Sequence, residues 1–324
     1  MRERPADLTD AEVADALRAH WRLDVTAVRY APVGYGAFHW TAVDTAGSHW
    51  FATASRVASG AEAADLRATM DAARCLADAG LDFVVAPVQA STGEAVIPAG
   101  PGYAITLFPF ADGVPLSWAD ALSPADRLSV ADMLAALHTA TSLSGPVPIR
   151  SLSPPSRAEL EISIRERGRP WRGGPYSEAA RALVSEHADG LVAALAAFDD
   201  LVGDVAASGS RVLTHGEPHP GNLIRHGAGF RLIDWDTAGL APPERDLWSI
   251  LSGTGVEAAR YTELTGHDVS QAAVALYRLR WDIDDIGLML ADFRADHRQD
   301  KDTEVGWAGL VAAAHRVVSA AKSR

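Results

Sequence analysis

The sequence is short of several residue types, and each shortage excludes a class of protein. Only one of its 324 residues is cysteine, Cys75, so the chain holds neither an intrachain disulfide nor a multi-cysteine zinc or iron–sulfur site. No apolar run approaches the roughly 20 residues of a membrane-spanning helix. The first twenty residues are charged and lack the apolar stretch of a signal peptide. We therefore expect a cytoplasmic protein with no membrane partner.

Lysine is almost absent, because only Lys301 and Lys322 are lysines among 29 basic residues. Any mechanism that needs a lysine in the first 300 residues is therefore excluded. Acidic side chains outnumber basic ones by 42 to 29, which gives a formal net charge of −13. Such a field repels nucleic acid and favours a cationic small molecule, although acidity also serves solubility alone.

The remaining composition, 48% hydrophobic and 22% charged, is that of a globular protein. A helix is expected over 9–20, followed by short segments rich in aromatic and β-branched residues. The helix expected over 61–80 ends at a glycine suited to a left-handed cap. The predicted strands cover 25–33, 38–43, 49–54, 83–88, 95–98 and 103–108.

Helical periodicity dominates after residue 116. The predicted helices cover 124–140, 155–167, 177–207, 244–251, 270–293 and 303–321. The exception is 211–233, where two strand-like runs flank a loop rich in proline and glycine. The fold class is therefore α+β, with a small β-rich N-terminal lobe over 1–110 and a larger, mainly helical C-terminal lobe over 111–324.

The densest group of chemically able side chains lies in residues 214–239, THGEPHPGNLIRHGAGFRLIDWDTAG. Pro218 and Pro220 lack amide donors and fix φ, so this stretch is a rigid loop and not a helix interior. Apolar residues flank it on both sides. We therefore expect the core to anchor the loop at both ends.

Three oxygen-bearing side chains converge at this loop. Glu217 and Asn222 lie on it, five residues apart, and Asp234 follows the apolar run 230–233. A carboxylate at the end of a buried strand faces the same mouth as the loop. Two carboxylates and one amide offer oxygen ligands only, which suits magnesium that shares its coordination with substrate phosphates.

This pattern resembles the catalytic loop and metal-binding strand of the aminoglycoside phosphotransferase and choline-kinase-like enzymes, distant relatives of the protein kinases. Their hallmark is His-Gly-Asp, four residues, Asn, and then an Ile-Asp-aromatic strand end. The matching residues here are His215-Gly216-Glu217, Asn222 and Ile233-Asp234-Trp235. Further matches are the hinge Phe108-Pro109-Phe110 with Gly113, the helix end 134–138, and Pro243, Asp246 and Leu247. The order of the lobes matches too, and implies a bilobal protein-kinase-like fold.

The resemblance also implies a reaction. Asn222 and Asp234 would bind Mg²⁺ that bridges the phosphates of ATP or GTP, and Glu217 would accept the proton of the acceptor hydroxyl. His215 would orient the loop from within the core. Catalysis of this kind is mostly positioning and charge stabilisation.

The nucleotide would lie at the junction of the lobes. Gly34 and Gly36 stand where the family has a loop over the phosphates, although two glycines by themselves mark only a tight turn. Backbone groups around Phe108 and Phe110 would hold the base, unless both rings are simply packed apolar residues.

The sequence departs from the family at two positions. The family base is aspartate, and the extra methylene of Glu217 shifts its oxygens unless the loop compensates. The family also places a lysine on the third strand, where Thr53 stands here. The nearest cation is Arg56, which could grip phosphate in its place or be a surface charge. Glu62 or Asp65 could pair with that cation.

The acceptor is expected to be a small molecule. Related enzymes use acidic residues of C-terminal helices to attract amines, which implies substrate roles for Asp282 and Asp285, unless these form a solvated face. Asp236 would touch metal or substrate. The leading acceptor is an antibiotic, either an aminoglycoside or another compound containing a sugar or nucleoside. A sugar or amino-alcohol metabolite is the alternative. The sequence is compatible with a monomer or a homodimer.

Two other hypotheses for the function stay open. The residues His215, Glu217 and His219 alternate and could share one face in a zinc hydrolase, although no further ligand stands out. The altered base and the missing lysine would also suit a nucleotide-binding pseudokinase that transfers nothing.

Overall fold

The computed structural model describes residues 1–100, 102–206 and 210–322. The chain forms two compact units. Unit 1 comprises Met1–Arg150 and Arg211–Asp268, and unit 2 comprises Ser151–Ser210 and Val269–Arg324. The catalytic segment 214–239 therefore packs with the N-terminal residues in one unit. The expected boundary at residue 110 stays a prediction.

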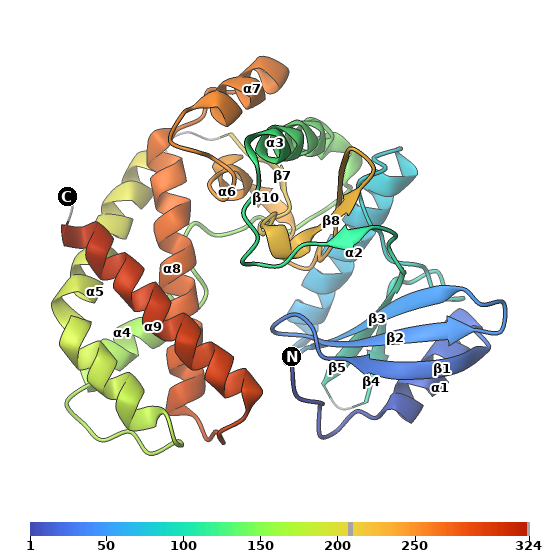
Figure 1. Ribbon diagram of the computed structural model, residues 1–324, viewed down its shortest axis with the longest axis horizontal. Helices are drawn as coiled ribbons and strands as arrows, with labels where there is room; N and C mark the ends of the chain where they lie inside the picture. The colour runs from blue at the N-terminus through green and yellow to red at the C-terminus, as the bar shows by residue number, and fades with distance from the viewer. Residues whose placement is uncertain (101, 207–209, 323–324) are drawn as a thin grey trace. The chain divides into compact units, whose positions relative to one another are not determined.

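The N-terminal part of unit 1 is a five-stranded antiparallel sheet with strand order β1-β2-β3-β5-β4 (Figure 1). The strands formed here agree closely with those predicted from β-branched and aromatic residues, which fit a pleated surface. Their bounds are β1 Val25–Ala31, β2 Phe38–Asp44, β3 His49–Arg56, β4 Val96–Ala99 and β5 Tyr103–Pro109.

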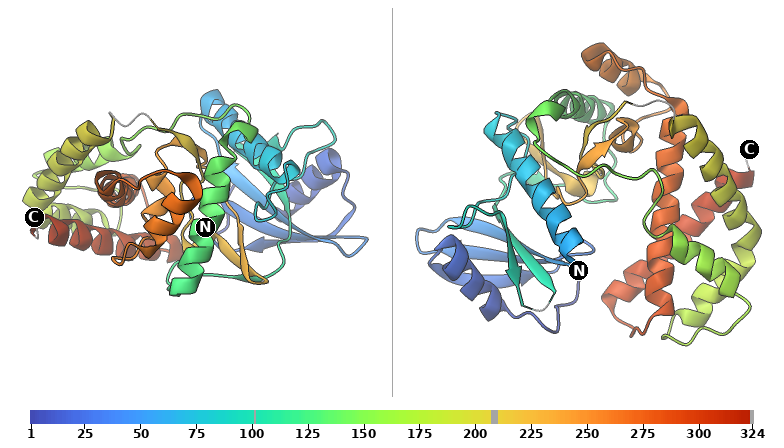
Figure 2. Two further views of the ribbon diagram at one scale, coloured as in Figure 1. Left: turned by 90° about the horizontal axis from the view of Figure 1, so that it is seen from above. Right: turned by 180° about the vertical axis from the view of Figure 1, so that it is seen from behind.

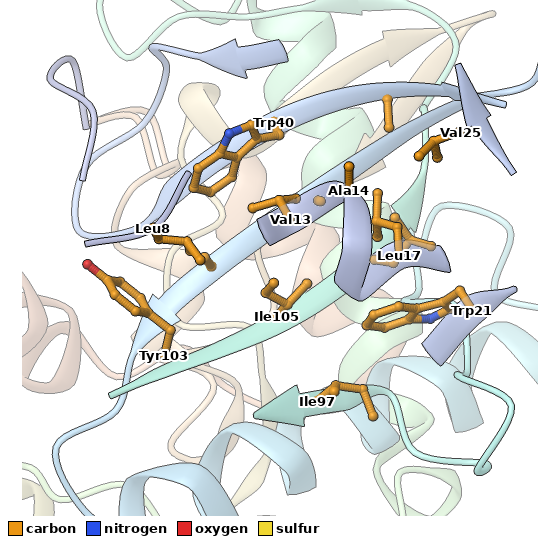
Figure 3. Close-up of a cluster of buried hydrophobic side chains, with 14 of the residues drawn as sticks. Leu8, Val13, Ala14, Leu17, Trp21, Val25, Trp40, Ile97, Tyr103 and Ile105 are labelled. Carbon is orange, nitrogen blue, oxygen red and sulfur yellow. The ribbon is translucent and has the colours of Figure 1, made fainter. Parts of the chain in front are cut away.

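Helix α1 (Asp10–Trp21) covers one face of this sheet. Thr9 begins the helix with a capping box, in which its side chain accepts the Glu12 N–H and Glu12 accepts the Thr9 N–H. Figure 3 shows Val13 and Leu17 of α1 among the buried side chains of the sheet. Burial of each such side chain stabilises the fold by about 1.5–3 kcal/mol.

Helix α2 (Gly60–Asp78) follows β3 and begins at Ser59, whose side chain caps the Glu62 N–H. The strand expected over 83–88 is not formed. Val84 makes an isolated bridge to Leu232, with hydrogen bonds from the Leu232 N–H to the Phe83 carbonyl and from the Val85 N–H to the Leu232 carbonyl, and the Val88 N–H donates to the Leu107 carbonyl. The segment therefore contacts strands of two sheets, but its pairing is too short to form a strand.

The rest of unit 1, as far as the structure describes it, carries two small sheets, three α-helices and two 3-10 turns. One sheet has the order β6-β8-β9, and the other pairs β7 with β10. The strands are β6 Val114–Pro115, β7 Val212–Thr214, β8 Leu223–His226, β9 Gly229–Leu232 and β10 Gly239–Ala241. The helical segments are α3 Pro124–Thr139 with the 3-10 turn η1 Thr141–Leu143, η2 Pro220–Asn222, α6 Glu244–Leu247 and α7 Val256–Thr265.

Two helix predictions near the end of unit 1 need correction. The helix expected over 244–251 is one turn long, and helix α7 was not predicted. Gly255 and Gly266 enclose α7, and both adopt left-handed backbone angles. Two glycines so close together in the sequence favour a loop prediction, and the short helix between them is therefore missed.

Unit 2 is helical, as predicted. Its helices are α4 Arg157–Glu166, α5 Ser177–Ala206, α8 Gln271–Arg294 and α9 Lys301–Lys322. Helix α8 packs along α4, α5 and α9 (Figure 2). Among the described residues, no helix has the length and apolar character required to cross a membrane. The α+β prediction is confirmed by the sheet of unit 1 and the helices of unit 2.

Candidate active site

The loop 215–222, which the sequence predicts to be the catalytic loop, begins where β7 ends, and a buried carboxylate holds its first two residues. The backbone N–H groups of His215 and Gly216 donate to Asp246, at 2.8 and 2.6 Å. Asp246 itself is fully buried. Two convergent amide donors on one carboxylate fix the direction in which the loop leaves the strand.

The glycine at position 216 is required by close packing. Its φ is +102°, and a Cβ atom there would lie 2.3 Å from Nη2 of Arg245. Arg245 cannot retreat easily, because it is buried and donates to the Thr214 hydroxyl and the Thr237 carbonyl. Arg245 therefore joins the catalytic loop to the turn that follows Asp234.

Asp246 also bonds to His138, which in turn bonds to Tyr261. His138 Nε2 lies 3.0 Å from Asp246 Oδ2, and His138 Nδ1 lies 2.7 Å from the Tyr261 hydroxyl. Burial tends to raise the pKa of Asp246, but the hydrogen bond from His138 and the charges of His138 and Arg245 outweigh it and lower the pKa. The carboxylate therefore stays ionised as an acceptor.

His215 lies in the core, as the resemblance implied. Its Nε2 donates to the Ile233 carbonyl at 2.9 Å, and its Nδ1 accepts the Glu217 N–H at 3.3 Å. These partners define one neutral tautomer. Burial lowers the pKa of His215 to about 4 and keeps the ring uncharged. His215 thereby ties the loop to the strand end that precedes Asp234.

Glu217 points away from this core and is about one-third exposed, with its Oε2 3.7 Å from His219 Nε2. Burial tends to raise its pKa, but the hydrogen bond and charge of His219 outweigh that effect and lower the pKa. The rings of Trp118 and His219 are nearly perpendicular, and their centroids lie 4.3 Å apart. The arrangement gives an ionised carboxylate beside a packed histidine.

Asn222 and Asp234 are brought together by the backbone. The Ile233 N–H donates to the Asn222 carbonyl at 3.1 Å, so Asp234 follows directly beside Asn222. The Asn222 Nδ2 donates to the Glu217 carbonyl at 2.9 Å. Since the nitrogen is used within the loop, the oxygen of the amide is the atom that could ligate a metal.

Asp234 has the left-handed φ of +68°, which is unusual for a residue other than glycine. Loss of hydration raises the pKa of Asp234 to about 6, and the charge of Glu217 adds to the rise. Burial and then the charges of Asp234 and Glu217 raise the pKa of Asp236 well above its ordinary range. These carboxyl groups therefore oppose one another's ionisation, and a divalent cation would relieve that repulsion.

The residues present fit an ion that takes further ligands from a substrate. Among the residues that the structure describes, no three His, Cys, Asp or Glu side chains group together to hold a metal ion. Asn222 and Asp234 would thus hold Mg²⁺ only with phosphate oxygens and water. The same finding argues against the zinc-hydrolase hypothesis. In addition, both ring nitrogens of His215 are already hydrogen-bonded to backbone groups.

The expected phosphate loop lies between β1 and β2. Gly34 and Gly36 have φ values of +70° and +85°, and both residues are exposed. Phe108 at the end of β5 is half-buried, whereas Phe110 is 49% exposed beside His49. These positions leave the loop and the hinge open to a ligand, and their nucleotide roles stay predictions.

Arg56 lies on the opposite face of the sheet from Thr53, because strand side chains alternate. The guanidinium of Arg56 lies 4.7 Å from the Tyr103 ring and 3.5 Å from Asp7, on the side that α1 covers. Thr53 instead pairs across the strands with His39 Nδ1 at 3.1 Å. To reach phosphates on the Thr53 side, Arg56 would have to leave both partners.

The acids expected to contact the acceptor are located in unit 2. Asp282 accepts from Arg316 at 2.7 Å, and Asp285 lies 4.0 Å from the same guanidinium. Burial raises the pKa of Asp282, and Arg316 opposes that rise. Asp284, which the sequence placed off this stripe, binds the N–H and hydroxyl of Ser156. A cationic acceptor at Asp282 would therefore compete with Arg316.

The fold and the loop together define a kinase-like phosphotransferase with an alcohol group as acceptor. A sequence model described as the phosphotransferase enzyme family matches residues 40–281. The chain belongs to this family, which confirms the resemblance noted in the sequence. Protein StrN of Streptomyces griseus is 26% identical over 250 residues, which are 72% of each chain.

Solved structures confirm the protein-kinase-like fold. A spectinomycin phosphotransferase in complex with ADP and spectinomycin superimposes with a TM-score of 0.74 at 17% identity, over 98% of this chain and 99% of that chain. An amicoumacin kinase with AMP-PNP and Ca²⁺ gives 0.66 at 15% identity, over 96% and 94%. The choline kinase LicA of Streptococcus pneumoniae gives 0.57 at 17% identity, over 95% and 98%.

Proposed function

We propose that this protein transfers the γ-phosphoryl group of ATP or GTP to a hydroxyl of a small molecule in the cytoplasm, with Mg²⁺ as the metal ion. The observation that supports the proposal is the hydrogen bond from the Ile233 N–H to the Asn222 carbonyl, which puts Asp234 beside Asn222, on a loop held by Asp246. The backbone of Glu217 is bound to His215 and Asn222 in the same loop. Catalysis by positioning needs such a preorganised site.

Each side chain has a separate task. Glu217 accepts the proton of the acceptor hydroxyl, and His219 beside it favours the ionised form that can do so. Asn222 and Asp234 would hold Mg²⁺, which supplies charge neutralisation at the phosphates when bound. Neutral His215 keeps the loop and the strand end at a fixed separation.

The nucleotide would lie under the loop of Gly34 and Gly36, with its base near Phe108 and Phe110. Support comes from the positive φ angles and exposure of the glycines. Related structures contain ADP or AMP-PNP. The cross-strand pair of His39 and Thr53 offers hydrogen bonds to the phosphates, but it does not supply the positive charge of a lysine.

For the acceptor, we propose an antibiotic that contains a sugar or nucleoside, such as an aminoglycoside, and hence a role in antibiotic resistance. The spectinomycin phosphotransferase and the amicoumacin kinase share the fold along nearly their whole lengths. Asp236, whose carboxyl lies near those of Asp234 and Glu217, would ionise beside an amino group of such a compound and attract it. Asp282 and Asp285 would do so only after exchange with Arg316.

A metabolite kinase is the second candidate, because a choline kinase also shares the fold. A screen separates the candidates. Hydroxylated antibiotics, sugars and amino alcohols are incubated with Mg²⁺ and either ATP or GTP, and products are detected by the mass of an added phosphoryl group. A product from an antibiotic alone supports the first candidate, and a product from a sugar or amino alcohol alone supports the second.

The role of Glu217 is tested with the acceptor that the screen finds. Glu217→Ala should abolish turnover and leave binding of the metal–nucleotide complex nearly intact, and Glu217→Gln should do the same. Unchanged turnover would refute the assigned role. A pseudokinase would release no nucleoside diphosphate with any acceptor, although it would still bind nucleotide.

A further inference from the structure

Arg150 lies where unit 1 connects three segments that are distant in sequence. It follows η1, and its N–H donates to the Leu240 carbonyl at 2.9 Å, while the Leu240 N–H donates to the Pro148 carbonyl. This pairing aligns residues 148–150 with β10. The backbone of Arg150 is therefore fixed beside the strand that follows the turn after Asp234.

The side chain of Arg150 binds that turn directly. Its Nε and Nη2 both donate to the Ala238 carbonyl, at 3.0 and 2.6 Å, and Nη2 also lies 3.4 Å from the Asp236 carbonyl. The planar guanidinium can make these bonds together because its N–H groups have a fixed fork geometry. Two carbonyls of one turn are thus held by one side chain.

The chain makes room for this contact with a glycine. A Cβ atom at Gly239 would lie 2.7 Å from Nε and 2.9 Å from Cγ of Arg150, and 2.6 Å from the Pro148 carbonyl. Any larger residue at 239 would displace the guanidinium from the turn. The close approach of Arg150 is therefore part of the packing of β10.

The turn concerned is the one that sets Asp234. Arg245 holds the turn from the side of the catalytic loop, through the Thr237 carbonyl. Arg150 holds the neighbouring carbonyls at 236 and 238. Because Asp234 adopts a left-handed φ, its carboxylate keeps its direction only while the turn after it is held.

Arg150 has one further partner, on helix α2. Its Nη1 donates to Asp65 Oδ2 at 2.5 Å, and the two side chains are 21% and 38% exposed. The sequence indicated Glu62 or Asp65 as a candidate partner of Arg56, but Arg56 lies on the other face of the sheet and pairs with Asp7. The acid of α2 thus pairs with a cation that also binds the turn after Asp234.

We infer that Arg150 is a positioning residue for Asp234, because it clamps the turn at 236–238 and ties that turn to helix α2 through Asp65. The inference rests on the proposed function, in which Asp234 holds the metal ion. Groups that orient a metal ligand from behind commonly change metal affinity by about 10–100-fold when they are lost. Loss of Arg150 should therefore weaken metal binding without changing the nucleotide contacts.

The test compares nucleotide affinity with and without a metal ion. ADP and GDP are titrated into the native protein and its variants, with Mn²⁺ or in its absence, and the ratio of the two dissociation constants gives the metal-dependent tightening. Arg150→Ala should reduce this ratio about tenfold and leave metal-free affinity unchanged. Arg150→Lys keeps the charge near Asp65 but cannot hold both carbonyls, so it should reduce the ratio similarly. Asp65→Asn should reduce it less.

Arg260→Ala is the control for the loss of an exposed arginine ion pair, because Arg260 makes a two-atom contact with Asp132. Its thermal stability should fall less than that of the Arg150 variants, because exposed ion pairs contribute little, and its ratio should stay native. A native ratio in Arg150→Lys, or in a folded Arg150→Ala, overturns the inference alone. If the native protein itself shows no tightening by the metal with either nucleotide, the proposed metal site fails and takes this inference with it.

Discussion

Nε2 of His138 lies 3.0 Å from Oδ2 of Asp246 in the core of unit 1. Helix α3, which is distant from the catalytic loop in the sequence, therefore supports the carboxylate that holds the loop. The same carboxylate accepts two backbone N–H groups from the loop. The position of Glu217 therefore depends on buried groups that never touch a substrate.

Removal of the acceptor capacity of Asp246 should destabilise the protein strongly. Asp246→Ala leaves two amide donors and His138 without their partner, and disruption of a buried charged network costs about 3–5 kcal/mol. Urea unfolding followed by circular dichroism measures this loss. The control Asp132→Asn removes an exposed ion pair, which contributes about 0–1 kcal/mol. Equal losses in both variants would contradict the supporting role of Asp246.

Substitution of Gly216 should be severe for a steric reason. Gly216→Ala would place Cβ against the buried Arg245 at a positive φ, so strain and overpacking together should cost about 3 kcal/mol or more. The control is Gly203→Ala in α5, where a Cβ meets open space and helix propensity should stabilise by about 0.5–1 kcal/mol. Calorimetric melting temperatures should move in opposite directions. A stable Gly216→Ala protein would show that Arg245 is not fixed.

The pH dependence of stability should reveal His215. Its pKa is about 4 in the folded chain and near 6.5 when unfolded, so the unfolded state binds more protons between these values. Stability is thus complete above pH 6.5 and falls as pH drops towards 4, by up to about 3 kcal/mol. Denaturant titrations at several pH values measure it. His215→Asn should flatten this part of the curve, and an unchanged slope would contradict the assignment.

Arg316 should compete with cationic acceptors. Arg316→Ala removes the guanidinium beside Asp282 and Asp285, and without that competing cation the two carboxylates should bind an amine more tightly. If these acids contact the acceptor, KM for a cationic acceptor should fall several-fold while KM for the nucleotide stays constant. The control Arg298→Ala breaks another exposed ion pair, with Asp300. An unchanged KM for the acceptor would remove Asp282 and Asp285 from the acceptor site.

Much of the fold followed from local signals. The strands of the N-terminal sheet and the long helices were predicted because alternation and helical periodicity record which face each element buries. The strand predicted over 83–88 was wrong, because apolar residues also occur in segments that make only an isolated bridge. Helix α7 was missed because its own sequence is short and lies between two glycines.

The candidate site also contains some residues that the sequence pattern indicated and others that it did not. The spacing of Glu217, Asn222 and Asp234 is a local pattern, and the backbone contact between residues 222 and 233 puts Asp234 beside Asn222, while their functional roles stay predictions. The supports Arg245 and Arg150 gave no comparable signal. Arginines are common in this chain, and nothing in their neighbouring residues distinguishes these two.

By itself, the sequence determined the family and the absence of a strand lysine, because these depend on residue types at short spacings. Only the tertiary structure decided which cation pairs with Asp65, since Arg150 is 85 positions away and Arg56 faces the other side of the sheet. It also decided that Asp282 binds Arg316. Contacts between residues far apart in sequence depend on how elements pack, and packing is a property of the whole chain.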